Sequence, residues 1–244
     1  MNARHTIRSS QKMFKIKVIG IDADDTLWDN LIYFKKTEDA FCDLMSPYYD
    51  QDTAYSMFYA NEQKNIELYG YGVKSFILSM IETICKKVPQ DKSAHIISNI
   101  IELGKKQLNE EPVLLEGVAE TLPILKKYYK LVLATKGDLL DQTLKLKKSG
   151  LAKYFDHVEV MNEKNEEDYI EVLKRLNVKN EEFLMIGNSL RSDIIPVLNL
   201  GGSAIYIPYH TTWIHEVGDK KPTCPKFMEA INFKQAGELL QKAL

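Results

Sequence analysis

The strongest constraint on the fold of this chain is a short apolar segment that leads directly into a cluster of acids. The segment KIKVIGI occupies residues 15–21, and DADDT follows it at residues 22–26. The apolar, β-branched residues predict a buried strand, along which Asp22 and Asp24 point the same way if the strand persists. Crowded carboxylates repel one another, so keeping both ionised requires a nearby cation, most simply a divalent metal. The competing interpretation is that the Asp25-Thr26 pair caps a helix.

Composition excludes several classes of protein. The chain has 244 residues, with 32 basic and 34 acidic side chains and a net charge of −2, so it lacks the footprint of a nucleic-acid-binding protein. No apolar run approaches the length of about 18 residues that a membrane helix needs, and the start lacks the apolar core of a secretory signal. We therefore expect a small soluble molecule as partner, and no oligomeric state is predicted.

The cysteines indicate the redox compartment. Cys42, Cys85 and Cys224 are odd in number, widely spaced and without a CxxC pair. This pattern argues against a disulfide framework or a zinc cluster and favours a reducing compartment. We expect a cytoplasmic protein in which the three thiols are small buried hydrophobic groups.

The order of the predicted elements indicates an α/β core with an inserted helical segment. Apolar residues recur at three and four positions between residues 31 and 112, which predicts about four helices. From there, helices alternate with short, nearly unbroken apolar strands: helices at 116–129, 138–149, 166–176 and 193–200, strands at 131–134, 157–160, 183–186 and 204–207. This alternation predicts a doubly wound parallel sheet that the first strand joins. The predicted units are a loose basic tail at 1–13, an α/β core at 14–30 and 113–244, and a helical cap at 31–112.

Residues that follow the predicted strands are the candidate site. Ligands of open α/β sheets bind beyond the carboxyl ends of the strands. The chemically capable residues there are Asp22, Asp24, Thr135, Lys136, Gly137, Lys164, Asn188 and Asp193. Carboxylates, a hydroxyl, an ammonium and a glycine-opened turn together suit a phosphate held against a metal.

In their order along the chain, these motifs resemble those of the haloacid dehalogenase-like (HAD) hydrolase superfamily. The family's DxDxT motif corresponds to residues 22–26, its Ser or Thr after the second strand to Thr135, and its lysine to Lys164. The fourth motif, usually GDxxxxD, corresponds to residues 187–193, with Asn188 in place of the first acid. The resemblance covers nearly the whole chain and points to phosphatases with a helical, C1-type cap.

The resemblance implies a mechanism and a set of roles. Asp22 would be the nucleophile that forms an aspartyl-phosphate, and Asp24 the general acid and base. Thr135 and Lys164 would hold the phosphoryl group and offset its charge, with Lys136 and Gly137 beside them. Mg²⁺ would be held by a set of oxygen atoms from Asp22, the Asp24 backbone carbonyl, Asp193 and Asn188.

Departures from the family pattern leave alternatives open. Asn188 offers an amide oxygen without charge, which predicts weaker metal binding than in typical relatives. Dehalogenases of this superfamily lack an acid at the position of Asp24, since halide needs no proton on leaving, so a phosphatase is favoured over a metal-independent 2-haloacid dehalogenase. A phosphate-binding or regulatory protein with little turnover is the other alternative. The substrate is left as a nucleoside monophosphate, a sugar phosphate or another small phosphate, with the segment YGYG at 69–72 either lining its pocket or forming an interhelical turn.

Overall fold

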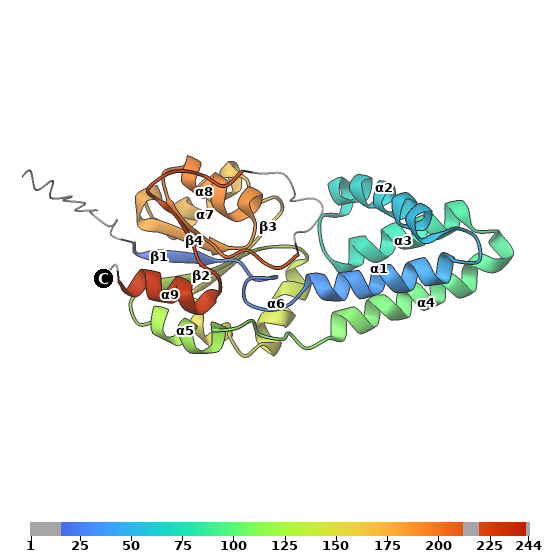
Figure 1. Cartoon of the computed structure of the whole chain (residues 1–244), viewed down its shortest axis with the longest axis horizontal. Coiled ribbons are helices and arrows are strands. Elements are labelled where there is room, and N and C mark those ends of the chain that lie inside the picture. Colours follow the sequence, from blue (N-terminus) through green and yellow to red (C-terminus); the bar gives the residue numbers. More distant parts are fainter. Residues whose placement is uncertain (1–15, 212–219, 243–244) are drawn as a thin grey trace, which may run out of the picture.

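A six-stranded parallel sheet forms the centre of the protein in the computed structural model, which describes residues 16–211 and 220–242 (Figure 1). Its strand order is β3-β2-β1-β4-β5-β6. The strands are β3 (His157–Met161), β2 (Lys130–Lys136), β1 (Val18–Ile21), β4 (Phe183–Gly187), β5 (Ser203–Tyr206) and β6 (Phe227–Glu229). The predicted parallel α/β sheet is confirmed, and β1 lies inside it between β2 and β4. The predicted tail at 1–13 lies outside the described residues.

Helices cover both faces of the sheet because side chains alternate along each strand. One face carries α5 (Val118–Leu125), α6 (Leu139–Lys148) and α9 (Phe233–Gln241), and the other carries α7 (Glu166–Leu176) and α8 (Ile195–Asn199) (Figure 1). In β1, Ile19 and Ile21 belong to the first apolar cluster, whereas Val18 belongs to the second. Burial on both faces is why these strands are continuously apolar in the sequence.

Four helices extend from the sheet as a bundle with its own core. They are α1 (Leu31–Met45), α2 (Gln51–Tyr69), α3 (Val73–Lys87) and α4 (Gln90–Asn109), and they confirm the predicted helical segment (Figure 1). The ring of Phe58 packs at its centre, with centroids 5.6 Å from Phe41 and 5.2 Å from Phe76. We propose that residues 31–112 form a cap domain, with its boundaries in the segments that join β1 to α1 and α4 to α5.

Several local predictions differ from the structure. The strand β6 and the helix α9 were not predicted, and α5 is shorter than the helix expected at 116–129. A π-helical turn at Leu190–Ile194 precedes α8, where a regular helix was expected from Asp193. Short 3₁₀ turns lie at Ala152–Tyr154 and Asn180–Glu182.

The burial prediction for the cysteines is wrong for two of the three. Cys42 is buried in the bundle, but Cys85 and Cys224 are exposed, and all three are free thiols. Cys85 follows the buried Thr83 and Ile84 on α3 and points to the outer side of that helix, and Cys224 lies in the loop before β6.

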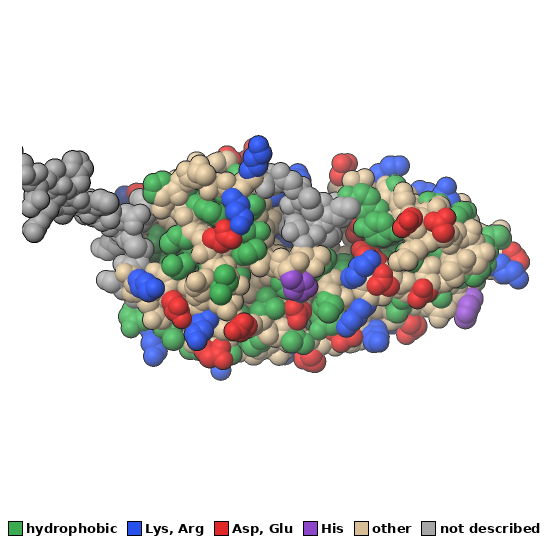
Figure 2. Space-filling view, in the orientation of Figure 1, with side chains coloured by type: hydrophobic (Ala, Val, Ile, Leu, Met, Phe, Trp, Pro, Cys, Tyr) green, Lys and Arg blue, Asp and Glu red, His purple; other side chains and the backbone are tan. Residues whose placement is uncertain are grey.

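The surface in Figure 2 carries acidic and basic side chains interspersed over both the sheet region and the bundle. No continuous basic stripe is visible among the described residues on this face. Within the described ranges, none of the helices combines the length and apolar character needed to cross a bilayer.

Candidate active site

A cavity of about 120 Å³ lies between the carboxyl ends of the strands and the helical bundle. Its sheet side is lined by all eight residues predicted for the site: Asp22, Asp24, Thr135, Lys136, Gly137, Lys164, Asn188 and Asp193. The fold brings them together because β1, β2, β3 and β4 are parallel neighbours, so the loops that follow them emerge at one edge.

Lys164 joins two buried carboxylates at the floor of the cavity. Its Nζ lies 2.7 Å from Asp22 Oδ1 and forms a second ion pair with Asp193 Oδ1. Lys164 and Asp193 are each 1% exposed and Asp22 is 7% exposed. Charges that are this deeply buried need partners, so the three side chains form one electrostatic unit.

Burial and neighbouring charges set the protonation of this unit. Burial raises the pKa of Asp22 to about 7; the Lys164 ammonium opposes that rise, and the charges of Asp193 and Asp24 add to it. Burial disfavours the charge on Lys164, but the carboxylates of Asp193 and Asp22 outweigh it and hold the lysine's pKa well above its usual range. Asp22 therefore depends on Lys164 to stay ionised.

Backbone geometry places these groups. Lys164 has a positive φ of 56°, a conformation uncommon for residues other than glycine, just after the end of β3. A Cβ atom at Gly187 would overlap the Asp193 carboxylate, so glycine is required at the end of β4. Asp193 Oδ2 accepts a 3.0 Å bond from Ser189 N, while Ser189 Oγ caps the π-helical turn that contains Asp193.

The end of β2 supplies the predicted phosphate-binding side. Thr135 is 1% exposed, and Lys136 Nζ donates to Ser192 Oγ at 3.0 Å. The same ammonium lies 4.6 Å from the centroid of the Tyr71 ring, which comes from the bundle. Gly137 has a φ of 119°, which lets the chain turn sharply from β2 toward α6.

Asp24 makes contacts that the sequence analysis did not predict. Its Oδ1 accepts hydrogen bonds from Trp28 Nε1 at 2.8 Å and from Lys145 Nζ at 2.7 Å. Its Oδ2 accepts one from Gln142 Nε2 at 2.8 Å. Of these three partners, Gln142 and Lys145 lie on α6, three residues apart and thus on one helix face, which is the signal in the sequence that would have pointed to them.

Asp25 anchors the first helix of the bundle. Its Oδ1 accepts bonds from Asn30 N at 2.9 Å and Leu31 N at 3.1 Å, where α1 begins. Burial raises the pKa of Asp25 to about 7, and the charge of Asp24 adds to this shift. The N-cap residue of α1 is Asn30, so the interpretation that the Asp25-Thr26 pair caps a helix is wrong, although Asp25 does accept backbone bonds where α1 begins. Asp22, Asp24 and Asp25 all line the cavity.

The donor set at the cavity floor fits a hard divalent cation. Two carboxylates, Asp22 and Asp193, share a single ammonium, so the unit retains a negative charge. Asn188 Oδ1 adds an amide oxygen, which accepts a 3.3 Å bond from Thr26 Oγ1. The described residues contain no group of three or more His, Cys, Asp or Glu side chains arranged to hold a metal. The donors nearest Lys164 are the two carboxylates of Asp22 and Asp193, with the amide oxygen of Asn188 beside them in the cavity. All of these donors are oxygen atoms, which Mg²⁺ prefers.

The bundle side of the cavity is mainly apolar. It is lined by Leu31, Phe34, Ile66 and Phe76, with Glu62, Ser75 and the segment from Gly70 to Gly72. Of the segment predicted at 69–72, Tyr69 is 59% exposed and does not line the cavity.

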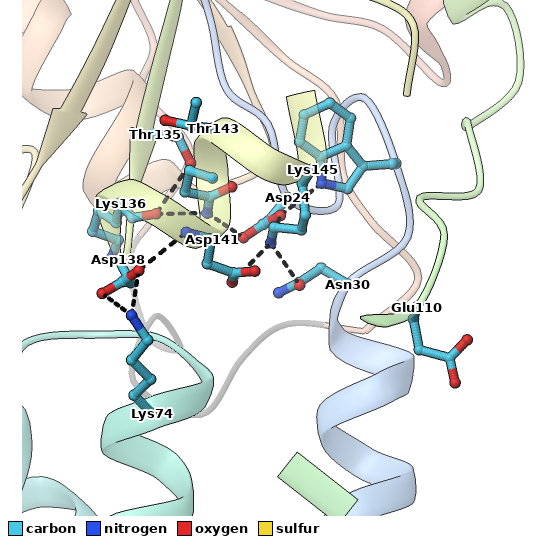
Figure 3. A network of polar contacts seen from close by, with 12 residues as sticks. Asp24, Asn30, Lys74, Glu110, Thr135, Lys136, Asp138, Asp141, Thr143 and Lys145 are labelled. Carbon is cyan, nitrogen blue, oxygen red and sulfur yellow. Dashed lines mark hydrogen bonds and ion pairs between the residues drawn. The ribbon is translucent and has the colours of Figure 1, made fainter. Parts of the chain in front are cut away.

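Two polar contacts join this side to the sheet. Lys74 Nζ lies 2.9 Å from Asp138 Oδ1 (Figure 3). Tyr71 OH donates to Glu163 Oε2 at 2.9 Å. The first of these links α3 of the bundle to the residue that caps α6.

Comparisons with known proteins agree with this architecture. A haloacid dehalogenase-like hydrolase family model matches residues 16–201. A haloacid dehalogenase-like family hydrolase from Xanthomonas campestris has a similar structure, with a TM-score of 0.82 and 33% identity over 96% of this chain and 94% of that one. A 2-haloacid dehalogenase from Pseudomonas syringae shares the fold, with a TM-score of 0.64 and 19% identity over 94% of this chain and 100% of that one.

A sequence relative with an assigned activity matches a shorter segment. The glyceraldehyde 3-phosphate phosphatase of Pyrococcus furiosus is 32% identical over 99 residues, or 38% of this chain. The match spans 41% of that relative's own length.

Proposed function

Since the chain belongs to the haloacid dehalogenase-like hydrolases, we propose that it is a magnesium-dependent phosphatase acting on a small phosphate monoester through an aspartyl-phosphate. The observation that carries the proposal is the buried unit in which Lys164 Nζ contacts both Asp22 and Asp193, with Asp24 lining the same cavity. A nucleophile, a charge-offsetting ammonium and a proton donor are the groups that this reaction requires.

The residues act in two steps. Asp22 attacks phosphorus through a carboxylate oxygen while the bond from phosphorus to the ester oxygen breaks. Asp24 gives that oxygen a proton, and the alcohol leaves. In the second step Asp24 takes a proton from water as the water oxygen attacks the phosphorus of the aspartyl-phosphate, which releases phosphate and restores Asp22.

Phosphate binding falls to groups around Asp22. The Thr135 hydroxyl would donate to a phosphoryl oxygen, with Lys136 and the backbone at Gly137 on the same side. Lys164, already in contact with Asp22, would offset the charge on the nucleophile and on the phosphoryl group. Each of these residues lines the cavity.

Asp22, Asp193, Asn188 and the Asp24 backbone carbonyl would hold the magnesium ion. When bound, the ion would neutralise charge on the phosphoryl oxygens and orient them. Because Asn188 is uncharged and already accepts a bond from Thr26 Oγ1, we expect weak magnesium binding.

Asp24 is also what favours a phosphatase over a metal-independent 2-haloacid dehalogenase. A halide leaves without a proton, so a dehalogenase has no use for a carboxyl group at this position of the cavity. The phosphatase relative from Pyrococcus furiosus supports the same choice. A phosphate-binding protein with little turnover is the second candidate, and it is favoured by Asn188 replacing a charged metal ligand.

The cavity supports a compact leaving group. Its volume of about 120 Å³ and its apolar walls on the bundle side suit a small organic phosphate. A nucleoside monophosphate or a sugar phosphate would place its ester group at Asp22 and its body against α1, α2 and α3. The three free thiols are compatible with a cytoplasmic setting.

The test is hydrolysis of an aryl phosphate with magnesium and with EDTA, comparing wild type with Asp22→Asn. We expect magnesium-dependent phosphate release that the variant lacks, with both proteins folded by circular dichroism. Undiminished turnover in Asp22→Asn would contradict the mechanism. EDTA-insensitive release of halide from a 2-haloacid would favour the dehalogenase, and binding of a phosphate analogue without hydrolysis of any ester in a broad panel would favour the binding protein.

A further inference from the structure

We propose that Gln142 and Lys145 of α6 are positioning residues that hold the Asp24 carboxylate in place for proton transfer to and from the leaving group. The inference rests on the proposed function of Asp24 as general acid and base. Neither residue belongs to the four motifs that suggested the function, and both line the cavity.

The carboxylate of Asp24 is held from both of its oxygens. Oδ1 receives two donors, Trp28 Nε1 at 2.8 Å and Lys145 Nζ at 2.7 Å, whereas Oδ2 receives one, Gln142 Nε2 at 2.8 Å. Three donors that converge on one carboxylate, one from the loop at Trp28 and two from α6, fix both its rotamer and its plane. An acid-base group gains most of its effect from such fixed placement.

Gln142 occupies its place at an energetic cost. Its Nε2 donates both to Asp24 Oδ2 and to the Lys136 backbone oxygen, each at 2.8 Å, so acceptors on two sides fix the orientation of the amide. Gln142 is 2% exposed, and its Oε1 is buried without a hydrogen-bond partner among the residues that the structure describes. A buried unpaired carbonyl is destabilising, so the two donors of Gln142 serve a purpose other than stability alone.

Lys145 links Asp24 to the residue that precedes α1, the first helix of the bundle. Besides Asp24, its Nζ donates to Asn30 Oδ1 at 3.2 Å and lies 3.9 Å from Asp141 Oδ2 (Figure 3). Its side chain is only 17% exposed, and that of Asp24 is 23% exposed, so solvent screens their ion pair incompletely. The ammonium therefore stands at the junction between α6, the Asp24 loop and the start of α1.

The donors are distributed unequally over the two oxygens of Asp24. Among the described residues, Oδ1 accepts two hydrogen bonds, whereas Oδ2 accepts one. Because a carboxylate oxygen has two lone pairs, Oδ2 is the oxygen with room for a further hydrogen-bond partner. In the proposed reaction, Oδ2 would face the ester oxygen as the phosphorus–oxygen bond breaks, and the attacking water in the second step.

The test compares two esters of similar size and different leaving groups. Para-nitrophenolate leaves without a proton, whereas the alkoxide of benzyl phosphate needs one. We expect Gln142→Met and Lys145→Met to lower kcat/KM for benzyl phosphate roughly 10- to 100-fold, and for para-nitrophenyl phosphate by less than about threefold, since a positioned acid contributes about 10²- to 10⁴-fold. Asp24→Asn should give the same contrast in a stronger form, and Lys145→Arg should restore part of the loss.

Lys147→Met is the matched control, because Lys147 is an exposed lysine of the same helix. It should leave both rates unchanged. Equal losses for the two esters in Gln142→Met and Lys145→Met would overturn the inference, and so would wild-type rates for benzyl phosphate.

A second readout separates this inference from the proposed function. In carbon-labelled protein, the carboxyl resonance that Asp24→Asn removes should shift in Gln142→Met and Lys145→Met but not in Lys147→Met. An unshifted resonance would overturn the positioning roles whatever the kinetics. A wild type that hydrolyses neither ester would contradict the proposed function, and the resonance would then decide whether Gln142 and Lys145 hold Asp24.

Discussion

Replacing Lys164 with methionine tests whether burial makes the ion pair at the cavity floor essential. Lys164 Nζ lies 2.7 Å from Asp22 Oδ1, with side-chain exposures of 1% and 10%. Lys174 Nζ lies at the same 2.7 Å from Glu171 Oε1, but those side chains are 67% and 58% exposed. The two pairs have equal distances, so what distinguishes them is burial and the second buried carboxylate, Asp193, that Lys164 contacts.

The expected magnitudes follow from that difference. Lys164→Met leaves Asp22 and Asp193 buried without a counter-charge, and removing one partner of a buried pair costs about 3–5 kcal/mol. Out of a total stability of about 5–15 kcal/mol, this is a large fraction. Lys174→Met removes a pair that solvent already screens, so we expect no measurable change.

Urea denaturation at pH 7.5 in the presence of EDTA measures both variants. Adding Asp22→Asn to Lys164→Met should recover part of the loss, because one of the two uncompensated carboxylates is then neutral. Equal small losses for Lys164→Met and Lys174→Met would refute the reasoning. A double variant less stable than Lys164→Met alone would also contradict it.

Three further predictions concern the bundle, the contact between the bundle and the sheet, and the end of β4. Burial, reinforced by the charge of Glu62 and opposed by Lys35, raises the pKa of Glu38 from 4.5 to about 7. The folded protein then keeps a proton that the unfolded chain releases, so stability falls as pH rises from about 4.5 to about 7, by about 3 kcal/mol at most. In Glu38→Gln the urea midpoint should change less with pH across that range than in the wild type. A pH dependence equal to that of the wild type would contradict this. Lys74→Met removes the 2.9 Å ion pair with Asp138. Because an exposed pair is worth under about 1 kcal/mol, KM should rise about two- to fivefold while kcat is retained. A fall in kcat alone would contradict this. Gly187→Ala forces the Asp193 carboxylate away from β4 and should lower activity at least about tenfold, because small displacements at a site cost that much. A Glu181→Ala control, at an exposed residue in the turn before β4, should leave activity unchanged.

Sequence patterns predicted those parts of the fold that depend on local burial. The helix α7 has the predicted bounds, because an amphipathic stretch there begins with a capping box between Asn165 and Asp168. The strands β2 and β4 were found within two residues at each end, because strands buried on both faces are continuously apolar. The short edge strand β6 was missed, since its three residues carry too little pattern.

The residues of the site that follow a strand were predictable from the sequence. The positions of Asp22 and Lys164 relative to their strands were enough to bring them to one edge of the sheet. The partners of Asp24 were not predictable in this way, because Gln142 and Lys145 reach it from a helix whose packing depends on the whole sheet. The π-helical turn also escaped prediction, since it follows from Asp193 bending back to the Ser189 amide.

Trapping the covalent intermediate tests the central claim most directly. Wild type mixed with a phosphate monoester labelled on phosphorus would be quenched in acid, digested and mapped by mass spectrometry. We predict one alkali-labile phosphoryl group on the peptide that contains Asp22, absent from Asp22→Asn. Turnover of the ester with no label on that peptide, or with the label on another residue, would contradict the account.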